Sequence, residues 1–218
     1  MVHISNGVSA SRIQMPDTWP DETSKLAIYP SASFTFLAVG RLIRLKNYPR
    51  LLAALTEVPV DRRWRLLIAG EGRDRENLQK LAAQLGLSER VEFLGNVSNM
   101  GECLASANVF VMSSDSEGLP IALIEATLAG LPVVVTNVGG CAEVVHAVCN
   151  GIVVDDLDDG SFAKALTRIL EDDDLRASFS RNARLYGAKY ELSTALSEHL
   201  NLYARAIGGR QYQERQVA

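Results

Sequence analysis

The sequence of 218 residues is poor in cysteine, in histidine and in long apolar runs. Its three cysteines, Cys103, Cys141 and Cys149, are odd in number and lack metal-ligand spacing. This argues against a disulfide framework and favours a reducing compartment. No stretch approaches the roughly 20 apolar residues that a membrane-spanning helix needs, and no signal-peptide core opens the chain. We therefore expect a cytoplasmic protein, and no metal.

An excess of positive charge is also lacking, because 26 acidic residues outnumber 22 basic ones and give a formal charge of −4. This argues against a general nucleic-acid partner, although basic residues cluster locally between Arg41 and Arg75. The composition, 47% hydrophobic and 22% charged, is that of an ordinary globular protein. The length suits one large domain or at most two small ones.

Strand and helix signals alternate with short connections between residues 34 and 172. This alternation predicts an α/β fold: a Rossmann-like, doubly wound, six-stranded parallel sheet with ligands at the carboxyl ends of its strands. The expected strands are 34–39, 64–69, 91–95, 109–112, 132–135 and 150–154. We expect residues 1–33 to be an irregular linker, 34–190 the Rossmann-like domain, and 191–218 a final helix and a tail that is frayed from Gly208 to Ala218.

The most informative stretch runs from Val109 to Glu143 and reads as strand, loop, helix, strand and loop. Pro120 suits the first position of the helix and Gly130 its end, so backbone amides around residues 117–121 would face a phosphate or sugar oxygen. Glu125, in the second turn, could then reach a hydroxyl pair such as a ribose diol. The alternative is that Glu117 only caps the helix and Glu125 is a solvated surface charge.

A second cluster of polar residues follows the first expected strand. Arg41, Arg44 and Lys46 precede a helix that should start near Tyr48–Pro49, an arrangement that could neutralise a diphosphate or be simply a solvated basic loop. Residues on the common edge of the parallel strands should converge, and they are Arg41, Lys46, Gly70, Gly95, Ser113, Glu117 and Gly139.

Two other ligand classes fit the sequence poorly. Gly70-Glu71-Gly72 lacks the third glycine of a dinucleotide-binding motif, because Arg75 occupies that position. The acidic segment between Asp155 and Asp174 lacks the alternating pattern of a calcium loop. We read its residues as helix starts, with Asp159 or Ser161 capping one helix and residues 172–174 the next.

The block EGLPIALIE, followed by AxxAGxPVVxTxxGG, closely resembles the nucleotide-sugar-binding signature of the retaining glycosyltransferases of family 4 (group 1), which have the two-domain GT-B architecture. Glu117 and Glu125 match its two glutamates, with seven residues between them. GRL with Lys46 resembles the family's pyrophosphate clamp, although Asn47 stands where the family usually has glycine. Asn tolerates positive φ, so the turn can survive.

The resemblance covers roughly residues 4–205 and implies the C-terminal, donor-binding half of such an enzyme. Arg41 and Lys46 would neutralise the diphosphate as the nucleotide leaves, Glu117 would contact sugar hydroxyls, and Glu125 would hold the ribose. The remaining residues implied in the donor pocket are Gly40, Gly70, Gly95, Ser113, Gly118, Leu119 and Pro120. Such enzymes are generally metal-independent, and the only small molecule expected is the nucleoside-diphosphate sugar itself.

The segment Ser5-Asn6-Gly7-Val8 resembles the family's link from a first, acceptor-binding domain, which we therefore expect to be missing. The final helix would pack on that domain, and any peripheral membrane association would run through it. We expect this polypeptide alone to bind donor but to transfer little. The alternative is a non-catalytic nucleotide-sugar-binding module, or a subunit completed by a separate acceptor-domain chain. An epimerase or phosphorylase of the same architecture is disfavoured, because its signature is absent.

Overall fold

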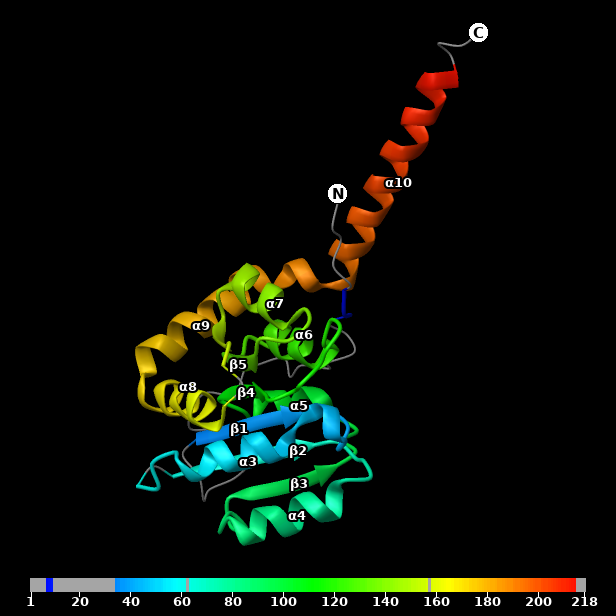
Figure 1. The fold of residues 1–218 in the computed structure, drawn as a ribbon. Coiled ribbons are helices and arrows are strands. Elements are labelled where there is room, and N and C mark those ends of the chain that lie inside the picture. Colours follow the sequence, from blue (N-terminus) through cyan, green and yellow to red (C-terminus); the bar gives the residue numbers. More distant parts are fainter. Residues whose placement is uncertain (1–6, 10–33, 62, 157, 215–218) are drawn as a thin grey trace.

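The computed structural model describes residues 7–9, 34–61, 63–156 and 158–214. Six parallel strands form one sheet in the order β3-β2-β1-β4-β5-β6 (Figure 1). They are β1 Phe34–Val39, β2 Trp64–Ala69, β3 Val91–Gly95, β4 Val109–Met112, β5 Val133–Thr136 and β6 Gly151–Val154. The predicted Rossmann-like, six-stranded sheet is confirmed.

Helices connect the strands and cover both faces of the sheet (Figure 1). They are η1 Arg44–Lys46, α3 Tyr48–Thr56, α4 Arg75–Gln84, α5 Met100–Ala105, α6 Ile121–Leu128, α7 Cys141–Val148, α8 Asp159–Glu171, α9 Asp173–Tyr186, η2 Gly187–Tyr190 and α10 Leu192–Glu214. The last helix, α10, continues through residues 208–214, which were expected to be frayed. It projects away from the sheet in Figure 1.

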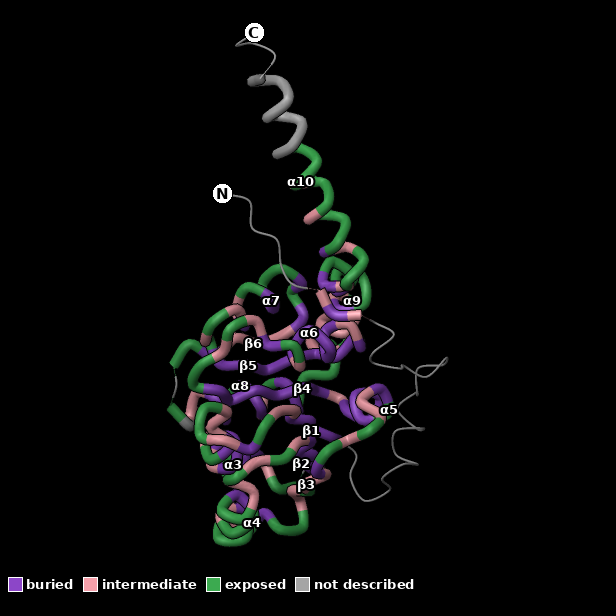
Figure 2. The backbone as a smooth tube through the Cα atoms, turned by 90° about the vertical axis from the view of Figure 1, so that its right-hand side faces the viewer, coloured by how far each residue is buried: buried purple, intermediate pink, exposed green. Residues whose placement is uncertain are grey.

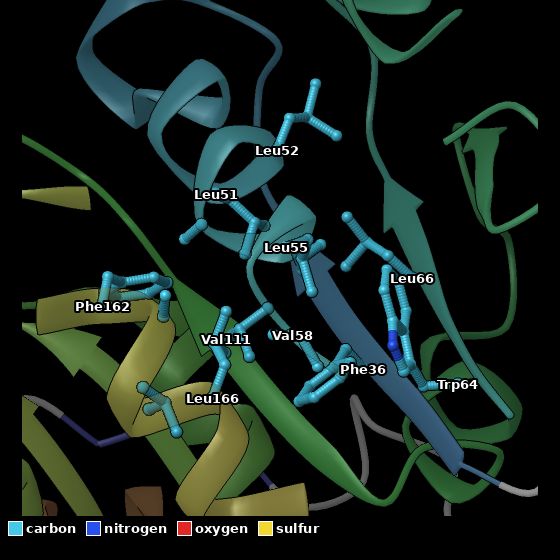
Figure 3. Packing of buried hydrophobic residues seen from close by; sticks show 14 of the residues in the cluster. Phe36, Leu51, Leu52, Leu55, Val58, Trp64, Leu66, Val111, Phe162 and Leu166 are labelled. Atoms are coloured by element: carbon cyan, nitrogen blue, oxygen red, sulfur yellow. The ribbon is translucent and has the colours of Figure 1, made fainter. Parts of the chain in front are cut away.

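The side chains of alternate residues in each central strand point into two separate hydrophobic cores. Phe36 of β1 and Val111 of β4 lie in the core beneath α3, α4 and α8, where α3 contributes Leu51 and Leu55 (Figure 3). Leu37 points to the opposite core, beneath α5, α6 and α7. Because both faces are covered, the central strands β1, β2 and β4 are nearly continuous apolar runs, and their backbone is coloured almost entirely as buried in Figure 2. Burying each such side chain stabilises the fold by roughly 1.5–3 kcal/mol.

Short polar side chains begin several helices. Asp172 accepts a hydrogen bond from the Leu175 amide at the start of α9, as predicted. At α8 the prediction was wrong by one residue: Asp158, and not Asp159 or Ser161, is the cap and accepts from the Ser161 amide. Its position just before the first helical residue lets its carboxylate reach that amide. The hydrogen bonds from Ser161 lower the pKa of Asp158 below its ordinary value.

Residues 7–9 are the described part of the segment 1–33, and the rest of that predicted linker lies outside the described residues. Val8 is buried and forms a parallel bridge with Glu191, beside Tyr190. A Cβ at Gly7 would lie 2.6 Å from the Leu192 Cα, so only glycine allows this approach. The first described segment, residues 7–9, therefore packs where α10 begins.

The strand order reverses between β1 and β4. The chain runs outward from β1 through β2 to β3, then returns to β4 on the other side of β1. In open parallel sheets this switch point leaves a crevice at the carboxyl ends of the two strands, where ligands bind. The loops that follow β1 and β4 are therefore the first place to look for a site.

Candidate functional site

Three glycines bring the ends of β1, β2 and β3 into direct backbone contact. The Gly70 amide donates to the Gly95 carbonyl oxygen at 2.7 Å. Gly70 has φ +139, and a Cβ there would lie 2.1 Å from the carbonyl oxygen of Gly40. No side chain fits at that contact, so this trio, hereafter the glycine joint (Gly40, Gly70 and Gly95), requires glycine at its centre.

The diglycine turn after β5 supports the loop that carries Glu117. Gly139 has φ +52, and a Cβ there would lie 1.7 Å from the carbonyl oxygen of Glu117. The Gly140 amide donates to the Gly118 carbonyl oxygen at 2.7 Å. The turn therefore lies directly against the backbone of residues 117–118, and this contact requires glycine at position 139.

Lys46 and Glu117 meet at the switch point. The Lys46 Nζ lies 2.5 Å from the Glu117 Oε1, and their side chains are only 20% and 11% exposed. The Ser114 hydroxyl donates to the same oxygen at 2.6 Å. Among the described residues, the Glu117 Oε2 accepts no hydrogen bond, and the Lys46 ammonium has two further donors. The pair can thus take up both acceptor and donor groups of a ligand without separating.

The loop before α3 has the predicted conformation. Asn47 is left-handed, with φ 40 and ψ 51, and its side chain caps α3 by accepting from the Arg50 amide at 3.2 Å. Asparagine therefore replaces glycine here without losing the turn. The Tyr48 hydroxyl donates to the Gly40 carbonyl oxygen at 3.1 Å. Burial raises the pKa of Tyr48 above its ordinary value, and the Glu117 carboxylate raises it further, so this donor stays protonated.

The other predicted residues of the switch point differ in exposure. Arg41 and Gly118 are exposed, Leu119 is half-buried, and Pro120 is buried. The helix begins one residue later than predicted, because Pro120 is the N-cap residue of α6. Its cap position carries no side-chain hydrogen bond, so the alternative that Glu117 caps the helix is wrong.

Glu125 lies within α6 and is only 7% exposed. The alternative of a solvated surface charge is therefore wrong. Burial of a carboxylate costs free energy unless hydrogen bonds or charges compensate it, so a glutamate at this buried position needs a compensating partner.

Sequence reasoning missed several side chains that hold the two loops together. They are Arg50, Ser114, Asp115 and Thr136. The Thr136 hydroxyl of β5 donates to the Ser114 carbonyl oxygen at 2.7 Å, within the buried interior. The one feature of the sequence that could have indicated these contacts was Asn47, because its side-chain amide can both cap a helix and bond to a neighbouring loop.

Two cavities border the loops. A void of about 10 Å³ lies beneath Lys46, between the ends of β1 and β4, and is too small for a ligand. A cavity of about 530 Å³ lies on the far side of the same loop, between α3 and α4, and its walls include Asn47, Asp74 and Asp115.

The cysteines contribute no nucleophile at this edge. All three are free thiols, and Cys103 and Cys141 are buried. Burial raises the pKa of Cys141 to about 12, with Glu117 raising it and Lys46 lowering it, so the thiol stays protonated. No group of three or more His, Cys, Asp and Glu side chains among the described residues is arranged to hold a metal ion. In the same residues, no helix is long and apolar enough to cross a membrane.

Comparison with known proteins assigns the family. A model of the family described as glycosyl transferases group 1 matches residues 24–186. The lipopolysaccharide core biosynthesis glycosyltransferase LpsE of Rhizobium meliloti (strain 1021) is 34% identical over 173 residues, which cover 79% of this chain and 48% of that protein. The D-inositol 3-phosphate glycosyltransferase of Corynebacterium urealyticum is 34% identical over 175 residues, covering 76% and 41%.

Solved structures show the same fold. The crystal structure of WaaG, a glycosyltransferase involved in lipopolysaccharide biosynthesis, gives a TM-score of 0.77 at 25% identity and covers 91% of this chain and 55% of its own. Anabaena HepE in complex with UDP gives a TM-score of 0.81 at 23% identity, covering 93% and 57%. The chain spans about half the length of the curated relatives it matches. With the family model matching most of its length, the chain belongs to the group 1 glycosyltransferases.

Proposed function

We propose that this chain is the donor-binding half of a retaining glycosyltransferase of the GT-B type (family 4), using a nucleoside-diphosphate sugar as hexosyl donor. The observation that carries the proposal is the Lys46–Glu117 pair, brought together from two strand ends at the switch point of the sheet. A cation and a carboxylate side by side suit the two parts of such a donor, its diphosphate and its sugar hydroxyls. Family membership supports the same reading.

In this proposal each side chain has one task. Lys46 and the exposed Arg41 bind the diphosphate, the Glu117 Oε2 accepts from a sugar hydroxyl, and Glu125 holds the ribose diol. The amides of Gly118 and Leu119 add donors near the start of α6, where the helix dipole favours an anion. The glycine joint lets the nucleotide approach the backbone of the strand ends closely.

The chemistry follows from charge development. As the bond between the sugar C1 and the diphosphate oxygen breaks, its electron pair leaves with the diphosphate. The acceptor hydroxyl oxygen then bonds to C1, and its proton passes to the departing diphosphate. Negative charge on the leaving group grows in the transition state, so the fixed cations Lys46 and Arg41 stabilise it more than the ground state. No metal is required for this step in the proposal.

The acceptor would be bound by a further domain, in accordance with relatives about twice as long as this chain. We propose that the chain by itself binds donor and transfers little, and the acceptor is a glycan, a lipid or a small molecule. A non-catalytic nucleotide-sugar-binding subunit is the second candidate. Transfer restored by a separately produced acceptor domain would support the enzyme, and saturable binding with no transfer in any such mixture would support the subunit.

Titration calorimetry with UDP, GDP, ADP and their sugar conjugates tests the donor site. UDP comes first, because HepE has been solved with UDP and with UDP-glucose. Lys46→Ala and Arg41→Ala should each weaken binding about tenfold or more, the loss of a charge-assisted contact. Lys80→Ala, on the exposed face of α4, is the matched control and should change nothing. No saturable binding of any nucleotide would refute the proposal.

A further inference from the structure

We propose that Asn47, Arg50, Ser113 and Asp115 form a clasp that positions Lys46 for the diphosphate. The proposal rests on the proposed function for the ligand, but its geometry stands on the described residues alone. The clasp joins the loop between β1 and α3 to the loop between β4 and α6. The partners of its side-chain bonds are 63 to 68 residues apart in the chain. None of its four side chains needs to touch the ligand.

The Asn47 side chain bridges the two loops. Its Oδ1 accepts from the Arg50 amide at 3.2 Å, and its Nδ2 donates to the Asp115 Oδ1 at 2.9 Å. Glycine, the residue usual at this position in the family that the sequence resembles, could adopt the same left-handed backbone but could make neither bond. The departure at Asn47 therefore adds a connection that the turn itself does not require.

Arg50 completes the connection from the first turn of α3. Its guanidinium lies 2.8 Å from the Asp115 carboxylate and donates to the Ser113 carbonyl oxygen at 2.9 Å. The Arg50 side chain is 11% exposed and that of Asp115 is 40% exposed. A pair this exposed contributes little to overall stability. Its consequence is local, because the planar guanidinium fixes the relative position of the two loops.

The clasp pins the backbone on both sides of Lys46. The Asp115 amide donates to the Leu45 carbonyl oxygen at 2.9 Å. The Ser113 hydroxyl lies 3.1 Å from the Lys46 carbonyl oxygen and 3.0 Å from that of Asn47, and shares its hydrogen between them. Three consecutive carbonyls, at residues 45 to 47, are thus held by the opposite loop, which restricts the position of the Lys46 backbone.

A fixed Cα matters because lysine is flexible. Ordering its side chain costs rotamer entropy, and the ammonium must meet both Glu117 and the ligand. Because the clasp fixes the backbone from which the Lys46 side chain extends, less conformational entropy is lost when the diphosphate binds. Residues 47, 50, 113 and 115 are therefore positioning residues that act through Lys46.

Binding of a nucleoside diphosphate and its monophosphate, UDP and UMP or the pair whose base binds, measures this role. Ser113→Ala removes the hydroxyl that holds the Lys46 and Asn47 carbonyl oxygens, and Asp115→Ala and Asn47→Gly remove the side chains that hold the two loops together. Each variant should reduce the preference for diphosphate about tenfold, towards that of Lys46→Ala, while monophosphate affinity stays within about twofold. Asn47→Gly keeps the left-handed turn, so it isolates the side chain. In the double variant Lys46→Ala, Asp115→Ala the preference should fall no further than in Lys46→Ala alone.

Two controls separate positioning from general damage. Asp74→Ala removes a carboxylate from the wall of the cavity between α3 and α4, which Asn47 and Asp115 also line, but it leaves the clasp intact. This variant should keep the wild-type preference for diphosphate over monophosphate. Asp115→Asn keeps an oxygen acceptor for Asn47 and Arg50 and should restore part of the preference. If Asp115→Ala and Asn47→Gly both keep the wild-type preference while Lys46→Ala loses it, the clasp proposal is overturned.

A measurement without nucleotide distinguishes failure of the clasp from failure of the proposed function. The acetylation rate of Lys46 by an acetylating ester, followed by mass spectrometry, should rise several-fold in Asp115→Ala, with Lys80 as the internal reference. A raised rate in a protein that binds no nucleotide would support the clasp and refute the donor site. An unchanged rate would refute the clasp, whatever the protein binds.

Discussion

The glycine joint and the clasp fasten neighbouring strand ends in opposite ways. At Gly40, Gly70 and Gly95 the backbones themselves touch, and a Cβ on Gly70 would lie 2.1 Å from a carbonyl oxygen. At the clasp one backbone bond, from the Asp115 amide to the Leu45 carbonyl oxygen, is supplemented by side chains, of which that of Asp115 is 40% exposed. The joint is thus inseparable from the fold, whereas the clasp can be altered while the sheet stays intact. Substitutions at these and related positions should therefore lower the free energy of unfolding by graded amounts.

Gly70→Ala should have the largest effect, because the joint has no room for a methyl group. The strained φ of +139 and the contact with the Gly40 carbonyl together should lower the free energy of unfolding by roughly 3 kcal/mol. Urea unfolding followed by circular dichroism measures the loss. Gly86→Ala is the comparison, because an added Cβ there meets nothing within 4 Å. If Gly70→Ala lowers the free energy of unfolding no more than Gly86→Ala does, the close contact at Gly70 has no effect on stability.

Thr136→Val tests a side-chain fastening of the Glu117 loop. The valine has the same shape but leaves the buried Ser114 carbonyl without its 2.7 Å bond, so unfolding free energy should fall by about 1–2 kcal/mol. Thr194→Val removes an exposed bond to the Ala188 carbonyl and should cost less than about 0.5 kcal/mol. Equal losses in the two variants would contradict a special role for Thr136.

Gly86→Ala separates backbone strain from crowding. Gly86 follows α4 with φ +72, and a Cβ there would meet nothing within 4 Å. Only the left-handed backbone opposes the methyl group, so the expected loss in unfolding free energy is about 1 kcal/mol. A loss as large as that of Gly70→Ala would remove the distinction between strain and contact.

Gly118→Ala should have the smallest effect on stability. Gly118 is exposed, its φ lies outside the left-handed region, and nothing lies within 4 Å of the added Cβ. Unfolding free energy should change by less than about 0.5 kcal/mol. If Gly118 borders the donor as proposed, nucleotide affinity would fall in this variant while urea unfolding stays at the wild-type midpoint.

Local patterns in the sequence carried much of this structure. The strands, the left-handed Asn47 and the convergence of Lys46 and Glu117 on one edge all follow from short segments and from the rule that parallel strands end together. The roles of Asn47 and Asp115 as partners did not follow, because nothing local specifies which of several exposed loop residues will meet. The burial of Glu125 was equally invisible, since it depends on how α6 packs against distant elements.

The sheet order also divides the chain into two stretches that are contiguous in sequence, β1 to β3 and β4 to β6. Lys46 and Glu117 lie on either side of the seam between them, 71 residues apart. Pairing across that seam closes a long loop, so it is slow compared with pairing inside each stretch. A nucleotide bound there would contact both stretches, so it would stabilise only molecules in which the two stretches are packed together. It would also raise the free energy needed to separate the two stretches by partial unfolding. Binding would then report a completed fold.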